Sequence, residues 1–92
     1  MNRSDLIETV AKTQNMPRKR AEDAVSALFD ALATAMKADE RIEIRGFGSF
    51  TVRHYDPYVG RNPKTGDTVS VPGKRSPFFR VGKELRDKIN DE

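Results

Sequence analysis

The apolar positions of the chain follow a helical period in the first forty residues and a strand period after them. Up to residue 38, apolar residues recur at three- and four-residue spacings, which is typical of helices with one buried face. The pattern predicts a short first helix that Asn2 caps, and a longer second helix that starts at Pro17 and ends near Ala38. The proline separates the two helices, because it removes a backbone donor and disfavours helical geometry at the residue before it.

Residues 41–53 alternate polar and apolar side chains, which predicts two paired strands. The first strand is expected at Arg41–Arg45 and the second at Phe50–Arg53. The segment Gly46–Ser49 between them has two glycines around one aromatic residue. This composition fits a tight turn that directs Phe47 inward.

A third strand and a closing helix are expected near the C-terminus. Pro77–Val81 has the composition of a short strand, and Gly82 ends it. A helix from Lys83 to about residue 90 then buries Leu85 and Ile89. The predicted fold class is α+β, with two N-terminal helices, a three-stranded antiparallel sheet that carries an extended β-hairpin arm, and a short C-terminal helix.

The predicted arm covers about residues 53–76. Tyr58–Val59 and Thr68–Val71 read as strands that flank a loop without apolar core residues. Asn62 and Pro63 suit the first two positions of a type I turn, and Gly66 can adopt a positive φ. A loop of this length without core residues must project into solvent or into a partner.

The chain carries a formal charge of +3, and its sequence pI is about 9.4. Residues 1–52 contain eight Lys or Arg and eight Asp or Glu, and residues 76–92 contain four of each. Residues 53–75 contain five basic residues and two acidic ones, so the whole excess of 5 − 2 = +3 lies on the arm. A basic arm on a neutral body is the charge distribution expected for a polyanionic ligand.

A length of 92 residues predicts a single domain over residues 1–92. The absence of cysteine excludes disulfides and Cys-based metal sites. Without the arm, about 70 residues must form the core, and a monomer of that size is marginal. We therefore expect an intertwined dimer whose core contains Phe29, Phe47, Phe50 and Phe79. The first residues lack the apolar run of a signal peptide, so we expect a cytoplasmic protein without membrane contact.

Three motifs are similar to those of the bacterial HU and integration host factor family of histone-like DNA-bending proteins. They are Arg41–Phe50, Gly60–Asp67 and Gly82–Asp87, and they look most like the beta subunits of integration host factor. The resemblance covers nearly the whole chain. It implies a dimer without cofactor that lies on the bacterial nucleoid. Each subunit would insert its arm into the minor groove of one duplex, with Pro63 as the wedge between base pairs.

The chemistry of proline supports that role, because a wedge must be apolar, rigid and free of an unsatisfied donor. Arg61 and Asn62 can read minor-groove acceptors, and the other basic residues of the arm can neutralise phosphates. In the alternative interpretation, Pro63 only shapes the turn. The predicted DNA-binding set is Arg3, Arg45, Gly46, Arg53, Tyr55, Tyr58, Gly60, Arg61, Asn62, Pro63, Lys64, Thr65, Gly66, Lys74, Arg75, Lys83 and Arg86.

Residues outside the arm tip belong to this set mainly through the resemblance. Arg3 and Lys83 start helices, and equivalent basic positions in the family contact the DNA flanks. Arg45 and Glu43 match a pair that contributes sequence preference in the integration host factor beta subunit. Tyr55 and Tyr58 stand where family members commonly have arginine, so this arm is less basic than usual.

An enzymatic function is not expected, because His54 is the only histidine and there is no cysteine, phosphate-binding loop or metal-ligand cluster. His54 is expected to face outward beside the arm. A dimeric scaffold that binds acidic proteins or RNA is the alternative function. The sequence leaves open whether the partner subunit is identical or a related chain.

Overall fold

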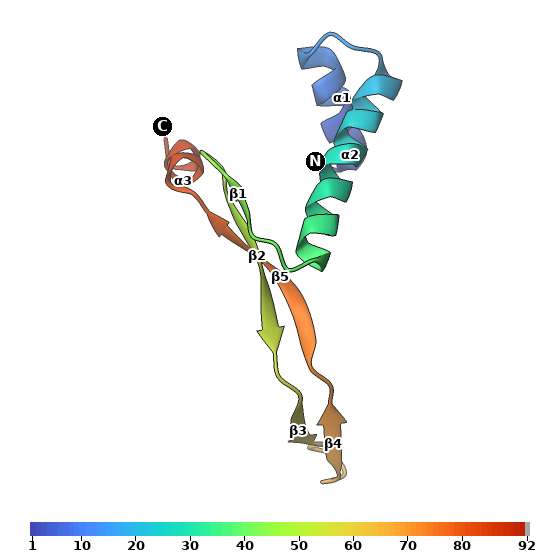
Figure 1. Ribbon diagram of the computed structural model, residues 1–92, viewed down its shortest axis with the longest axis vertical. Helices are drawn as coiled ribbons and strands as arrows, with labels where there is room; N and C mark the ends of the chain where they lie inside the picture. Colours follow the sequence, from blue (N-terminus) through green and yellow to red (C-terminus); the bar gives the residue numbers. More distant parts are fainter. Residues whose placement is uncertain (92) are drawn as a thin grey trace. The chain divides into compact units, whose positions relative to one another are not determined.

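The computed structural model describes residues 1–91, so Glu92, the last residue of the predicted domain, lies outside the described residues. The elements are α1 (Arg3–Thr13), α2 (Arg18–Lys37), β1 (Ile42–Ile44), β2 (Gly48–Tyr55), β3 (Tyr58–Arg61), β4 (Thr68–Val71), β5 (Lys74–Val81) and α3 (Lys83–Ile89) (Figure 1). They form two compact units, one of residues 1–35 and one from Met36 onward. The number and order of helices agree with the expected α+β fold. A single domain over the whole chain stays a prediction.

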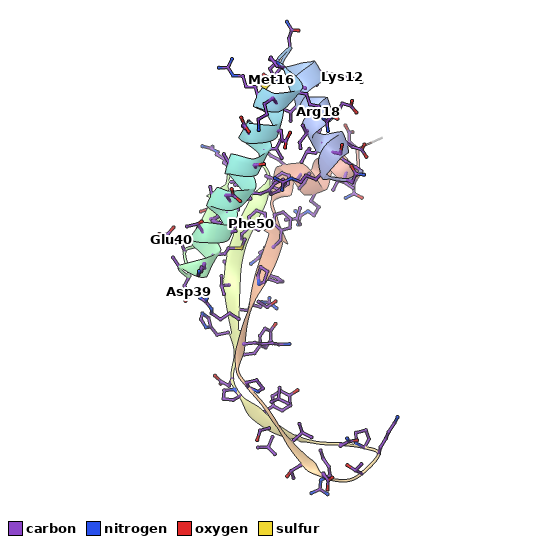
Figure 2. The ribbon with its side chains drawn as sticks, turned by 90° about the vertical axis from the view of Figure 1, so that its right-hand side faces the viewer. Lys12, Met16, Arg18, Asp39, Glu40 and Phe50 are labelled. Atoms are coloured by element: carbon purple, nitrogen blue, oxygen red, sulfur yellow. The ribbon has the colours of Figure 1, made fainter. Side chains whose placement is uncertain are left out.

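In the first unit, α1 and the N-terminal part of α2 form a helical hairpin. Asn2 and Asp5 make a reciprocal capping box, in which the Asp5 amide donates to Asn2 Oδ1 at 2.9 Å. The buried core consists of Ile7, Ala21 and Val25, and Ala21 is fully buried. A side chain as small as alanine allows the two helices to approach closely. Met16, at the turn between them, packs against this core (Figure 2).

The second unit contains an antiparallel sheet in the order β1-β2-β5 (Figure 1). β2 and β5 pair over eight residues, from Gly48 opposite Val81 to Tyr55 opposite Lys74. Both strands are therefore longer than the sequence predicted. Gly48 and Ser49, expected in a turn, belong to β2, and β5 begins at Lys74 rather than at Pro77, because the root of the arm continues the same hydrogen-bonded ladder.

The two faces of this sheet differ in character. Side chains opposite one another in the ladder share a face, so Phe50 lies beside Phe79 and Ser49 beside Arg80. The ring centroids of Phe50 and Phe79 are 4.8 Å apart. We call the face with Phe50 the apolar face, and the face with Ser49 and Arg80 the polar face.

Beyond Tyr55 and Lys74 the ladder is interrupted, and β3 and β4 form a separate two-stranded ribbon. Pro57 and Pro72 lie in the two connections, where proline cannot donate to a ladder. Gly73 fits this tight connection, because a Cβ there would lie 3.0 Å from the Tyr55 carbonyl oxygen and its neighbours would have to shift. The arm thus has a root made of β2 and β5 and a distal part made of β3 and β4 (Figure 1).

Two residues that were expected to be buried are exposed in the single chain, and for Phe47 the expected burial is that of a dimer core, which stays a prediction. Ile89 is 72% exposed, because it lies at the last position of a seven-residue helix, and only Leu85 of that helix is half-buried. Phe47 is 45% exposed, although its ring centroid lies 5.5 Å from that of Phe79. No helix in the described residues has the length and apolar composition needed to cross a membrane.

Candidate nucleic-acid interface

The tip of the arm is an ordered turn built around Asn62. Its backbone amide donates to the Asp67 carbonyl at 2.8 Å, and its carbonyl accepts from the Gly66 amide at 2.7 Å. Its side-chain oxygen accepts from the Lys64 amide at 2.9 Å. The bond from the Gly66 amide to the Asn62 carbonyl closes a turn of five residues, one more than a type I turn has. Gly66 accommodates this turn with a φ of +77°, as predicted.

This turn holds Pro63 in an exposed position at the end of the arm. Asn62 next to it is half-buried, because its amide, carbonyl and side chain all take part in the turn. The cations Arg61 and Lys64 flank the proline and are exposed, and Thr65 accepts a hydrogen bond from the Asp67 amide at 3.3 Å. An apolar ring is thus presented between two positive charges.

At the root of the arm, cations and aromatic rings lie together on the polar face. The Arg53 guanidinium stacks on the Phe78 ring, 3.4 Å from its centroid. The Lys74 ammonium lies 5.7 Å from the Tyr55 ring centroid. The predicted residues Arg53, Tyr55 and Lys74 are therefore neighbours, and Tyr55 occupies the polar face instead of contributing to the core.

The polar face also contains two arginines that the sequence analysis did not assign. Arg80 is opposite Ser49 in the ladder, and Ser49 is in turn opposite Glu43. Arg41 and Arg80, together with Glu43, line a shallow hollow of about 330 Å³ at the sheet end away from the arm tip. The sequence contained a signal for Arg80, because every second residue of a strand lies on the same face. That spacing leads from Lys74 through Ser76 and Phe78 to Arg80.

Arg45 and Gly46 border the same hollow. Gly46 adopts φ +84°, and a Cβ at this position would come within 2.6 Å of the Glu84 carboxylate. The positive φ favours glycine at this turn, whereas the flexible Glu84 side chain could move to admit a Cβ. Glu43 and Arg45 are both exposed, and the ion pairs of the described residues do not include one between them.

Arg75 differs from the other predicted phosphate contacts. It is opposite His54 in the ladder and lies on the apolar face, not on the polar one. Its guanidinium Nη1 donates to the Lys37 carbonyl at 3.0 Å and lies 3.3 Å from an Asp39 carboxylate oxygen. His54 is exposed as expected, and its Nε2 is 3.0 Å from the other Asp39 oxygen.

The predicted flank contacts lie on helices in different units. In the first unit, the Arg3 guanidinium donates to Ser26 Oγ at 2.6 Å and lies 5.6 Å from the Phe29 ring centroid. In the second unit, Lys83 is highly exposed and forms a loose ion pair with Asp87 at 3.8 Å. Arg86 on α3 and Tyr58 and Gly60 on β3 complete the predicted set, and Tyr58 is 63% exposed.

Away from this surface, one titration shift is resolved. The hydrogen bond from the Lys19 ammonium to Asp23, followed by the charge of that carboxylate, raises the pKa of Lys19. Within residues 1–91, no group of three or more His, Cys, Asp or Glu side chains is arranged to hold a metal ion.

The aromatic residues predicted for the dimer core are only partly covered in one chain. Phe29, Phe47 and Phe79 are 40%, 45% and 39% exposed, and Phe50 is half-buried. Phe47, Phe50 and Phe79 form one cluster in the second unit. So many partly exposed rings on a small body mark surfaces that need a partner.

Comparison with known proteins gives consistent results. A family model described as bacterial DNA-binding protein matches residues 1–90. The chain is 50% identical to integration host factor subunit beta of Alkalilimnicola ehrlichii over 91 residues, which cover 98% of this chain and 91% of that protein. It is 52% identical to integration host factor subunit beta of Serratia marcescens over 91 residues, 98% of this chain and 97% of that one.

Solved structures of the same fold include a cocrystal of Anabaena HU with DNA. It has a TM-score of 0.86 and 32% identity, and the alignment covers 100% of both chains. HU from Thermotoga maritima has a TM-score of 0.68 and 25% identity, with 97% of this chain and 98% of that chain covered.

Proposed function

Because the chain belongs to the family of bacterial DNA-binding proteins that includes HU and integration host factor, we propose that it is an architectural protein that bends duplex DNA. It acts as one subunit of a dimer and does not catalyse a reaction. Each subunit inserts its arm into the minor groove, and Pro63 enters between two base pairs. The protein thereby organises the nucleoid and assists recombination, replication and transcription.

The observation that carries this proposal is the exposed Pro63 on an ordered turn between two cations. Opening a base step costs a few kcal/mol, and the flanking contacts must offset that cost. A turn already ordered by hydrogen bonds loses little conformational entropy when it enters the groove. Arg61 and Lys64 supply charge at the site of insertion, so binding and kinking are coupled.

The polar face extends the proposed contact from the tip to the body. Arg53 and Lys74 would neutralise phosphates where the bent duplex returns toward the sheet. Stacking on Phe78 and Tyr55 restricts the conformations of their side chains. Arg80 and Arg41 continue the row to the hollow beside Arg45. Each neutralised phosphate releases counterions, so affinity falls steeply with salt.

The dimer is supported by the partly exposed aromatic cluster of Phe47, Phe50 and Phe79 and by Phe29. The named relatives are subunits of integration host factor, which implies that they assemble with another chain. The partner of this chain is either a second copy or a related subunit. The mass of the purified protein, measured alone and after addition of a short duplex, distinguishes the two.

The test of the function compares wild type, Pro63→Ala and Pro17→Ala in a fluorescence-transfer assay of DNA bending. Pro17 is an exposed proline outside the arm, next to the start of α2, so its substitution controls for loss of a proline as such. We expect Pro63→Ala to reduce both bending and affinity on intact duplex, and to lose less on nicked DNA, where stacking is already interrupted. Equal bending by all three proteins would refute the insertion. Tight binding to acidic proteins or RNA without duplex binding would favour the scaffold function.

A further inference from the structure

The root of the arm is tied to the end of α2 by three side chains of the second unit. Asp39 follows the last turn of α2 (Figure 2). One of its carboxylate oxygens is 3.0 Å from His54 Nε2 of β2, and the other is 3.3 Å from Arg75 Nη1 of β5. Arg75 also donates to the Lys37 carbonyl at 3.0 Å. One carboxylate thus connects both strands of the arm to the end of the helix.

The placement of Asp39 is unfavourable by itself. Its φ of +61° lies in the left-handed region, which glycine and asparagine adopt more readily. Its negative charge lies at the C-terminal end of a helix, where the helix dipole favours cations. Arg75 offsets the unfavourable charge locally, because its guanidinium brings a positive charge to the Asp39 carboxylate and donates to the Lys37 carbonyl at the end of α2.

The contact occurs at a mechanically important point of the arm. His54 and Arg75 are opposite one another, one rung before the last rung of the β2–β5 ladder. The ladder ends there, and Pro57 and Pro72 separate it from the distal part of the arm. A restraint at this rung holds the last paired residues of the arm root against the segment from Lys37 to Asp39.

We propose that Asp39, His54 and Arg75 form a positioning clamp that sets the direction of the arm, and that Arg75 acts through Asp39 instead of binding a phosphate. The proposal rests on the proposed DNA-bending function. Its geometric basis is the face on which Arg75 lies, which is opposite to that of Arg53 and Lys74. A clamp of this kind lowers the entropy that the arm loses on entering the groove.

The test uses Asp39→Asn with Asp56→Asn as a control that makes the same change of charge. Asp56 is an exposed acid in the connection between β2 and β3, outside the ion pairs of the described residues. Electrostatics alone predicts that removing either negative charge tightens DNA binding, by about twofold for an exposed site. The clamp predicts opposite effects of the two substitutions on DNA binding. Asp56→Asn should bind duplex more tightly, whereas Asp39→Asn should bind it about threefold to tenfold more weakly and bend it less. Tighter binding by both variants would overturn the proposal.

Arg75→Ala separates positioning from phosphate contact. A lost phosphate contact lowers the salt slope of binding by about one unit. The clamp instead predicts a salt slope equal to that of wild type, and a double variant with Asp39→Asn no weaker than either single one. A salt slope reduced by one unit in Arg75→Ala, with additive losses of affinity in the double variant, would overturn the proposal and show that Arg75 contacts a phosphate. Arg75→Lys, which retains the charge, should recover part of the bending.

Amide hydrogen exchange of the free protein tests the clamp without DNA. Asp39→Asn should lower protection of the paired backbone amides around His54 and Arg75 about tenfold, while the core amides of α1 and α2 retain theirs. Unchanged protection at the arm root would refute the clamp. Lowered protection in a protein that does not bind duplex would retain the clamp and reject the DNA-bending function.

Discussion

Phe79→Ala should weaken the dimer by an amount that the exposure of the ring determines. Phe79 is 39% exposed in the single chain, so about three-fifths of its surface is buried within its own subunit. A phenylalanine side chain has roughly 200 Å² of surface, which leaves roughly 80 Å² for the partner to cover. At about 25 cal/mol per Å² this area contributes ~2 kcal/mol to association, or roughly 30-fold in the dissociation constant. In a homodimer, the two substitutions add to ~4 kcal/mol, or roughly 900-fold.

The contacts of the Phe79 ring within its own subunit contribute a separate free energy, which stabilises the folded subunit instead of the dimer. Its buried three-fifths correspond to ~3 kcal/mol, and the contacts with the rings of Phe47 and Phe50 add to that value, so the substitution also lowers the stability of each subunit. Sedimentation equilibrium over a hundredfold concentration range measures the dimer directly, and Val59→Ala is the control because Val59 is an arm residue 70% exposed. A dissociation constant unchanged within twofold in Phe79→Ala, with reduced melting temperature at every concentration, would show that the ring stabilises its own subunit only.

The other predictions concern the glycines, the phosphate contacts and the sequence readout. Gly48→Ala should destabilise the protein by about 1–3 kcal/mol, because its Cβ would lie 2.5 Å from the Arg80 carbonyl oxygen. A Cβ at Gly66 would have open space around it, so the only cost of Gly66→Ala is the positive φ of that residue. Thermal unfolding in which Gly66→Ala lowers stability more than Gly48→Ala would contradict this prediction. Lys74→Ala and Lys83→Ala should each lower the salt slope of duplex binding by nearly one unit, or up to about two if both subunits contact DNA, and a slope equal to that of wild type would exclude them as phosphate contacts. Arg45→Ala should weaken a selected site more than random duplex at fixed salt, and equal losses on both would indicate a nonspecific, HU-like protein.

The sequence alone was sufficient for the order and type of the elements. Helical spacing with Asn2 as cap and Pro17 as break defines α1 and α2, and both helices form as expected. The arm was predictable because a polar segment with turn residues between two alternating strands has few other structures available. Gly66 also adopts the predicted positive φ.

Long-range pairing determined what the sequence could not show. The register of β2 and β5 lengthens both strands beyond their apolar patterns, because the hydrogen-bonded ladder continues into the root of the arm whether or not its side chains are apolar. The same register assigns each basic residue to a face. Arg53 and Arg75 look equivalent in the sequence, yet the ladder places them on opposite faces and only Arg75 meets Asp39.

The charge, the exposed proline and the shortage of core residues were therefore properties of the sequence, because composition and local turn chemistry produce them. Which cations act together was decided by tertiary structure, because residues such as Asp39, His54 and Arg75 are far apart along the chain and meet only when the strands pair beside the end of α2. Local periodicity contains no information about such contacts, since their geometry depends on the register between strands and not on the spacing within one.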